Sequence, residues 1–301
     1  MKKIFALAVS LLLVVTLAAC GSSAPKIGFA ASTFTNPFFL DIEEGIKAAL
    51  VGTDYELVSL GADNDAATQA GQIEDLIAQG VDLILLNPVD STTVGTQIAL
   101  ANSRGIPVIT VDRSAASGTV VAHVASDNVL GGEIAAEHLQ TLCPAGAPVL
   151  ELTGQPGASA AIDRSAGFQS VFGASNIAQS ATANWSRTEG QNVTEDFLTA
   201  QGNPVSVCIF AGNDEMALGA VQAILANSAT SMASSAVIGF DAIPDALASI
   251  RADELSATVE QQPYEIGRLA ALAALDHLAG RTVASSIPVP LALITKENID
   301  Q

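Results

Sequence analysis

Polar side chains directly follow several short apolar runs of the sequence, and a few more lie between the runs. They are Asn87, Asp112, Arg113, Asn213 and Asp241, with Arg164 and Gln261 less directly placed. In the neighbours Asp112 and Arg113, a carboxylate accepts hydrogen bonds and a planar guanidinium donates them, so the pair can clasp adjacent hydroxyl groups of a ligand. Any one of these residues alone is equally explained as a helix cap or a surface ion pair. Their shared position after apolar runs is what predicts a ligand-binding site.

The stretch from Ser32 to Phe39 combines two kinds of binding group. Ser32 supplies a hydroxyl and Asn36 an amide, while Phe38 and Phe39 supply two adjacent rings. Rings beside hydrogen-bonding groups suit a ligand with apolar C–H faces and a polar rim, such as a sugar. The alternative is that both phenylalanines pack in the core and that Asn36 only caps a helix beginning at Pro37.

Apolar runs alternate with helical patterns along the chain, which is typical of βαβ units and parallel sheets. In the first half we expect strands at 26–31, 55–60, 83–86, 108–111 and 120–124, and helices at 38–50, 66–78 and 92–103. In the second half we expect strands at 148–152, 177–183, 205–210 and 237–240, and helices at 130–142, 160–172, 190–200 and 215–226. A strand at 257–260, a helix at 264–279 and a strand-like run at 287–293 then complete the two sheets. The polar residues above therefore lie at the carboxyl ends of parallel strands, where open α/β sheets bind ligands.

The first nineteen residues are interpreted as a signal peptide, since Lys2 and Lys3 precede an apolar run from 4 to 15. The sequence LAAC at 17–20 resembles a bacterial lipobox, which makes Cys20 the lipid-modified first residue of the mature protein and 20–25 its tether. An ordinary signal peptide followed by an incidental Cys20 is the alternative. An uncleaved anchor is disfavoured, because the apolar run is short for a membrane span.

The charge balance disfavours two classes of partner. The chain has 12 basic and 31 acidic side chains, for a net charge of −19, and such a surface repels nucleic acid and anionic lipid headgroups. Cys143 and Cys208 are the cysteines that remain after Cys20, and either a disulfide or two separate buried thiols fits their spacing. Without a CxxC or HExxH motif, the sequence predicts neither a metal site nor a cofactor.

Six segments of the chain form a pattern: STFTNPFF (32–39), LLNPVDS (85–91), VITVDR (108–113), ASDNVLGG (125–132), FAGNDEMALGA (210–220) and VIGFDAIPD (237–245). Together these segments resemble the ribose-binding protein family, the substrate carriers of bacterial ABC sugar importers. The resemblance covers essentially the whole chain from Lys26 onward.

The resemblance implies an α/β protein of two Rossmann-like parallel-sheet lobes joined by a three-crossing hinge, the type I periplasmic binding protein fold. The N-terminal lobe would comprise 26–126 and 262–290, and the C-terminal lobe 127–261 and 291–301. The chain would cross between the lobes near Ser126–Asp127, Gln261–Gln262 and Pro290–Leu291. The family closes these lobes over one monosaccharide.

The resemblance also implies which residues bind the sugar. They are Ser32, Asn36, Phe38, Phe39, Asn87, Asp112, Arg113, Arg164, Trp185, Asn213, Asp241 and Gln261. At one of these positions the chain departs from the family pattern, because ribose binders carry Phe where this chain has Trp185. A ring stack is retained there with a larger area, which leaves the preferred sugar open.

The expected function is that of a non-enzymatic, extracytoplasmic protein that binds ribose or a related pentose or hexose. It would be a monomer, exported and either lipid-anchored to the outer face of the cell membrane or periplasmic, and it would deliver sugar to ABC permease and ATPase subunits. A sugar-sensing regulator or a chemoreceptor ligand protein of the same fold is the alternative, although a regulator needs a DNA-binding helix-turn-helix in place of the signal peptide. A sugar-acting enzyme could use Asp112 and Asp241, but a carboxylate beside Arg113 stays ionised and makes a poor general acid.

Overall fold

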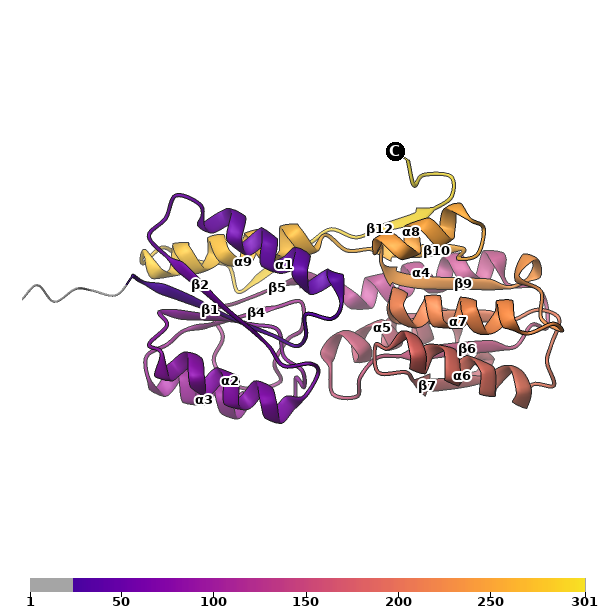
Figure 1. Cartoon of the computed structure of the whole chain (residues 1–301), viewed down its shortest axis with the longest axis horizontal. Helices are drawn as coiled ribbons and strands as arrows, with labels where there is room; N and C mark the ends of the chain where they lie inside the picture. The colour runs from indigo at the N-terminus through magenta and orange to yellow at the C-terminus, as the bar shows by residue number, and fades with distance from the viewer. Residues whose placement is uncertain (1–23, 301) are drawn as a thin grey trace, which may run out of the picture.

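The structure is a computed structural model, and it describes residues 24–300 of the chain. These residues form two α/β lobes placed end to end (Figure 1). The first lobe contains β1 (Lys26–Ala31), α1 (Pro37–Leu50), β2 (Glu56–Gly61), α2 (Ala66–Ala78), β3 (Leu83–Leu86), α3 (Gly95–Ser103), β4 (Val108–Val111), β5 (Ala122–Ser126), α9 (Pro263–Leu278) and β11 (Ser286–Val289). The second lobe contains α4 (Asn128–Leu142), β6 (Val149–Thr153), α5 (Ser159–Phe172), β7 (Gln179–Thr182), α6 (Arg187–Ala200), β8 (Cys208–Ala211), α7 (Asp214–Ala226), β9 (Ala236–Asp241), α8 (Pro244–Arg251), β10 (Ala257–Glu260) and β12 (Ala292–Thr295).

Each lobe is built on one six-stranded sheet. The strand orders are β11-β5-β4-β3-β1-β2 in the first lobe and β12-β10-β9-β8-β6-β7 in the second. All neighbouring strands are parallel except β10 and β12, which are antiparallel. The central strands β3 and β4 are apolar at nearly every position and buried along their length, because helices cover both faces of the sheet (Figure 1). The predicted α/β fold with two parallel-sheet lobes is confirmed.

The chain passes between the lobes three times. The connections run from β5 to α4, from β10 to α9 and from β11 to β12 (Figure 1). The strand-like run predicted at 287–293 is therefore two strands in different sheets, interrupted at the last connection. Helix α8 was not predicted, because it is only eight residues long and offers too few turns to show a period.

Several helices begin at the edge where the strands end. Asn36 caps α1, with its Oδ1 accepting from the Phe38 amide at 2.9 Å, and Asn213 caps α7, accepting from the Met216 amide at 3.0 Å. Pro37 occupies the first turn of α1, where no amide hydrogen is needed. The capping residues of these helices therefore face the region between the two lobes.

Facing glycines bring three pairs of helices into close contact. A Cβ atom on Gly132 of α4 would lie 2.1 Å from the Arg164 carbonyl oxygen of α5, and one on Gly167 would lie 2.0 Å from that of Val129. Gly45 and Gly267 meet in the same way between α1 and α9, as do Gly190 and Gly219 between α6 and α7. Any side chain at these positions would push the helices apart, so the glycines fix how deeply α5 and its Arg164 are set against α4.

The cysteine question is settled by the structure. Cys143 and Cys208 form a disulfide, with their Cα atoms 5.8 Å apart. Cys143 follows the end of α4 and Cys208 opens β8, so the bond ties a covering helix to the middle of the second sheet.

The predicted signal peptide and Cys20 lie outside the described residues. Between residues 24 and 300, no helix combines the length and the apolar character needed to cross a membrane.

We expect Gly132→Ala to lower the free energy of unfolding by about 1–3 kcal/mol, because the added methyl group has no space between α4 and α5. The matched control is Gly71→Ala in α2, where nothing lies within 4 Å of the added atom. That control should instead gain about 0.5–1 kcal/mol, since Gly is a poor helix former. Thermal unfolding of both variants checks this, and an equal shift in the two would contradict the role of the glycine contact.

Candidate ligand-binding site

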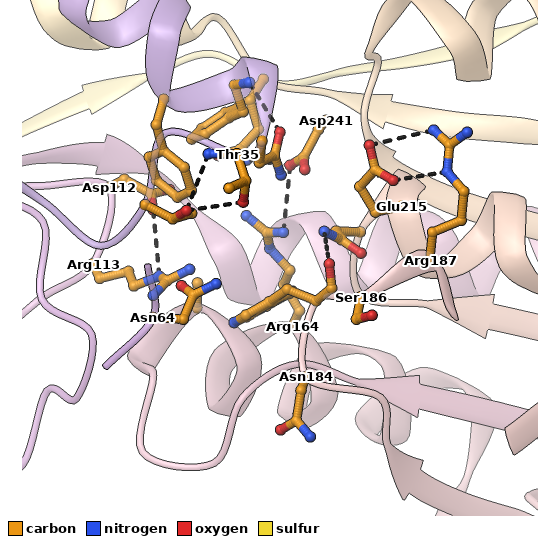
Figure 2. Close-up of a pocket in the computed structure, with 18 residues that line it drawn as sticks. Thr35, Asn64, Asp112, Arg113, Arg164, Asn184, Ser186, Arg187, Glu215 and Asp241 are labelled. Carbon is orange, nitrogen blue, oxygen red and sulfur yellow. Dashed lines mark hydrogen bonds and ion pairs between the residues drawn. The ribbon is translucent and has the colours of Figure 1, made fainter. Parts of the chain in front are cut away.

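A cavity of about 270 Å³ lies between the two lobes (Figure 2). Ten of the residues singled out from the sequence line it: Asn36, Phe38, Phe39, Asp112, Arg113, Arg164, Trp185, Asn213, Asp241 and Gln261. They reach it from strand ends and helix starts of both lobes, as the alternation of strands and helices requires.

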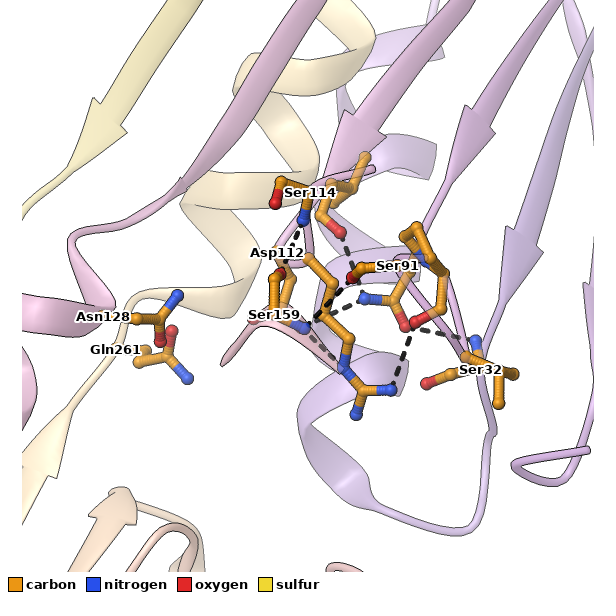
Figure 3. Close-up of polar contacts among 12 residues, drawn as sticks. Ser32, Ser91, Asp112, Ser114, Asn128, Ser159 and Gln261 are labelled. Atoms are coloured by element: carbon orange, nitrogen blue, oxygen red, sulfur yellow. Dashed lines mark hydrogen bonds and ion pairs between the residues drawn. The ribbon is translucent and has the colours of Figure 1, made fainter. Parts of the chain in front are cut away.

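Two of the predicted residues, Ser32 and Asn87, do not line the cavity and lie behind it. Asn87 is fully buried and donates through Nδ2 to Asp112 Oδ2 at 3.0 Å and to the Val111 carbonyl at 3.1 Å. Its Oδ1 accepts from the Ser32 amide at 3.1 Å (Figure 3). Asn87 therefore holds the Asp112 carboxylate in place, and direct ligand contacts by Ser32 or Asn87 stay predictions.

The aromatic wall of the first lobe serves the core and the cavity at once. Phe38 and Phe39 are 3% and 4% exposed, belong to the main hydrophobic core and meet edge to face with their centroids 5.2 Å apart. Asn36 caps α1 while it lines the cavity. The two phenylalanines therefore pack in the core and also line the cavity, and Asn36 both caps α1 and lines the cavity. Both interpretations of this stretch hold together.

Arg113 lies between rings of opposite lobes. Its guanidinium carbon is 5.5 Å from the centroid of Phe39 in the first lobe and 5.4 Å from that of Trp185 in the second. Nη1 donates to the Pro88 carbonyl at 3.2 Å, and Nε lies 3.7 Å from Asp112 Oδ2. Burial lowers the pKa of Arg113 to about 10, against the opposing effect of Asp112, so the side chain stays a cation at neutral pH.

Arg164 is the corresponding cation of the second lobe. It donates through Nε to Asn128 Oδ1 at 2.8 Å and through Nη1 to the Gly212 carbonyl at 2.7 Å. Nη1 also lies 3.5 Å from Asp241 Oδ1, and the guanidinium stacks on Phe240 at 3.7 Å from the ring centroid. Burial lowers the pKa of Arg164 as well, and the nearby carboxylates oppose that shift.

Asp241 is the acid that pairs with Arg164, and it is 7% exposed. Gln261 donates through Nε2 to Asp241 Oδ1 at 2.8 Å. Burial raises the pKa of Asp241 to about 7, while Arg164 and Gln261 favour the ionised form. Arg113 also favours the charged form, so the carboxylate of Asp241 is stabilised by both arginines of the cavity and by Gln261.

The backbone adopts left-handed conformations at several lining residues. The φ angles are 62° at Asp112, 50° at Asn184, 62° at Trp185 and 113° at Asp241. Such conformations are unfavourable for residues with a Cβ atom and concentrate where a side chain must be directed at a ligand. Here they turn a carboxylate, an indole and a second carboxylate away from regular strand or helix geometry.

Five buried polar atoms of the lining residues make no hydrogen bond to the protein. Three are acceptors, Asn64 Oδ1, Asp112 Oδ1 and Gln261 Oε1, and two are donors, Arg113 Nε and Trp185 Nε1. Since buried polar atoms are almost always hydrogen-bonded, this set marks where a ligand with both donors and acceptors would be held.

Eight lining residues were missed by the sequence analysis: Thr33, Thr35, Asn64, Ala160, Asn184, Ser186, Arg187 and Glu215. Asn64 follows β2 closely, so the strand-end pattern could have identified it. Arg187 and Glu215 are bonded to each other at 2.8 Å at the outer side of the cavity (Figure 2). Both lie in first turns of helices, a position that in sequence is typical of a solvated surface.

Within the described part of the chain, no group of three or more His, Cys, Asp or Glu side chains is arranged to hold a metal ion.

Comparison with known proteins agrees with this geometry. The sequence profile of the family described as "Periplasmic binding protein domain" matches residues 27–282. The chain is 44% identical over 272 residues to the ribose import binding protein RbsB of Bacillus subtilis, covering 90% of this chain and 87% of that protein. It is 39% identical to RbsB of Haemophilus influenzae, covering 98% and 100%.

Solved structures match over nearly the whole chain. The Caulobacter myo-inositol binding protein bound to myo-inositol superposes with a TM-score of 0.84 at 32% identity, covering 92% of this chain and 95% of that one. A periplasmic ribose ABC transporter structure from Conexibacter woesei gives a TM-score of 0.78 at 26% identity, covering 92% and 94%.

We expect Asn87→Asp to destabilise the protein in a pH-dependent way. The new carboxylate would replace the amide that lies 3.0 Å from Asp112, and two carboxylates so close raise each other's pKa in the folded state. A raised folded-state pKa contributes stability at low pH that is lost as the pH rises. The loss of unfolding free energy should therefore be greatest near about pH 8, by about 1–3 kcal/mol, and shrink toward about pH 5.

The control for this test is Asn87→Ala, which removes the same hydrogen bonds without adding a charge. Its deficit should be nearly independent of pH, and chemical denaturation of both variants at several pH values separates the two effects. A pH-independent deficit in Asn87→Asp would show that Asn87 does not hold the Asp112 carboxylate.

Proposed function

The chain belongs to the periplasmic binding protein family, and from this premise we propose that it binds a monosaccharide, ribose or a related pentose or hexose, between its lobes for delivery to an ABC importer. The observation that carries the proposal is the set of five buried atoms at the cavity without protein hydrogen bonds. Three accept and two donate, and every sugar hydroxyl can do both. The rings of Phe39 and Trp185, on either side of Arg113, add apolar faces that suit sugar C–H groups.

The proposed roles follow the positions of the side chains. Asp112 Oδ1 and Gln261 Oε1 would accept from sugar hydroxyls, and Arg113 Nε and Trp185 Nε1 would donate to sugar oxygens. Arg164 and Asp241 would form the innermost polar surface of the second lobe. Similar proteins bind different polyols, as the bound myo-inositol and D-allose of two solved relatives illustrate, so the fold sets the class of ligand and the side chains select within it.

We place the lobe boundaries at the three connections, with 26–126 and 262–290 in one lobe and 127–261 and 291–301 in the other. The connections near Ser126–Asp127, Gln261–Gln262 and Pro290–Leu291 would act as the hinge, since a few residues at element ends can absorb such a motion.

Family membership implies an exported, extracytoplasmic location. We further propose that the protein is a monomer, that Cys20 carries a lipid anchor on the outer face of the cell membrane, and that permease and ATPase subunits are its partners. The protein would return the sugar chemically unchanged, which a chromatographic comparison of sugar before and after incubation tests.

Arg113→Ala should weaken binding at least about tenfold for every sugar bound, because it leaves Asp112 and the sugar hydroxyls buried with fewer partners, at about 1–3 kcal/mol for each unsatisfied group. Arg113→Lys should restore little, since an ammonium cannot make the planar fork. Trp185→Phe should instead change the order of affinities among pentoses and hexoses, because it reduces the aromatic area that lines the cavity and removes the indole N–H.

Calorimetry with one panel of sugars measures all three variants. Arg281→Ala is the matched control, because Arg281 pairs with Asp276 on the exposed surface and should leave affinity unchanged. Wild-type affinity in Arg113→Ala would rule out this cavity as the sugar site.

The lipid anchor predicts that globomycin, an inhibitor of the lipoprotein signal peptidase, makes the uncleaved precursor accumulate. In the Cys20→Ser variant the same peptidase should have no substrate, so globomycin should change nothing. Normal processing of the wild-type chain in the presence of globomycin would argue for an ordinary signal peptide.

A further inference from the structure

Ser91, Ser114 and Ser159 lie close together where the two lobes meet (Figure 3). The Ser91 amide donates to the Gly157 carbonyl at 2.9 Å, and the Ser159 amide donates to Ser91 Oγ at 3.0 Å. The Ser114 amide donates to Ser159 Oγ at 2.9 Å. Ser91 and Ser114 belong to the first lobe and Gly157 and Ser159 to the second, so all three hydrogen bonds cross between lobes. We call this group the serine latch.

Two serines of the latch have matching roles. Ser91 and Ser159 each donate through the backbone amide and each accept through the side-chain hydroxyl, so the latch forms only when the two lobes are aligned in this way. A shift of one lobe along the other by one residue would break all three bonds together. The latch is therefore a specific contact and not a general approach of two surfaces.

Two neighbouring contacts also require the lobes to lie this close together. Gln155 of the second lobe donates through Nε2 to the Asn64 carbonyl of the first at 3.0 Å. A Cβ atom on Gly157 would lie 2.6 Å from Asp90 Oδ2, and its φ of +88° also favours glycine. Asp90 cannot easily withdraw, because its Oδ1 accepts from the amides of Thr92 and Thr93 at 2.8 and 2.9 Å.

None of the three latch serines lines the cavity, yet each is next to a part of the site. Ser114 follows Arg113, and Ser159 precedes Ala160, which does line the cavity. Ser159 also opens α5, the helix that carries Arg164. The latch thus joins the segment bearing one site arginine to the segment bearing the other.

We propose that the serine latch stabilises the closed arrangement of the lobes and thereby scales the affinity for every ligand alike, without contacting any ligand. This rests on the proposed function, in which ligand binds between the lobes. When only the closed arrangement binds tightly, apparent affinity is reduced by the fraction of molecules that are closed. Weakening the latch lowers that fraction and leaves the contacts to the sugar untouched.

The test uses the full mature protein with Ser91→Ala, Ser159→Ala and the double variant. The matched control is Ser103→Ala, which removes an exposed serine hydroxyl of the first lobe that bonds only within its own turn, to the Leu100 carbonyl. Each single variant should weaken binding by about 3–10-fold, the usual effect of one hydrogen bond, and by the same factor for every sugar in the panel. The loss should appear as faster dissociation in stopped-flow measurements.

The double variant removes both side-chain acceptors of the serine latch. Ser91→Ala takes the acceptor from the Ser159 amide and Ser159→Ala takes the acceptor from the Ser114 amide, so the double variant should weaken binding more than either single variant. In ligand-free protein, small-angle scattering should give a larger radius of gyration for the double variant than for the wild type or Ser103→Ala. Thermal midpoints without ligand should match the control, since each lobe keeps its own core.

Three results would overturn the proposal: unchanged affinity in both single variants, a changed order of preference among the sugars, or a lowered ligand-free thermal midpoint with unchanged affinity. If the wild type binds no sugar of the panel, the proposed function fails instead. The latch is then judged by ligand-free scattering alone, and equal radii for wild type and double variant would reject it.

Discussion

The structure depends most on the burial of two ion pairs, one from each lobe, at a single cavity. Asp112 and Arg113 belong to the first lobe, Arg164 and Asp241 to the second, and each of the four is between 3% and 7% exposed. Removing charges from water is costly even when they are paired. The pairs also act against each other, since Arg164 lowers the pKa of Arg113 and Asp112 raises that of Asp241. With a pKa raised to about 7, Asp241 contributes stability at low pH that is lost as the pH rises from about 4, its ordinary value, to about 7.

The surrounding fold compensates for this cost with fixed hydrogen bonds. Carbonyls of Pro88 and Gly212 accept from the two arginines, Asn128 accepts from Arg164, and Gln261 donates to Asp241. These partners lie on parallel strand ends and helix starts, positions that a buried sheet holds rigidly. A site held in this way is already ordered before a ligand arrives, so little side-chain entropy is lost on binding.

A site residue could be predicted from the sequence where a single apolar run defines the strand that the residue follows. Asp112 and Asp241 could be placed because each follows a buried strand whose length the run defines. What could not be predicted depends on contacts between distant segments. Asn87 also follows a strand, but its amide turns toward Asp112 because the Ser32 amide, 55 residues away in sequence, occupies its carbonyl oxygen. The disulfide between Cys143 and Cys208 spans 65 residues, so its formation depends on how α4 packs on the sheet and not on spacing.

The residues that line the cavity and the residues that join the lobes differ in the effect that we propose for them. In the proposed function, Trp185 would touch the ligand and affect one sugar differently from another, because sugars differ in where their hydroxyl groups lie. The proposed latch contact between Ser91 and Ser159 would act on the arrangement of the lobes and affect all sugars alike. Selectivity is a difference between affinities, so a change that scales all of them leaves it intact. If both proposals hold, two separate sets of residues let the preferred sugar and the strength of binding vary independently within one fold.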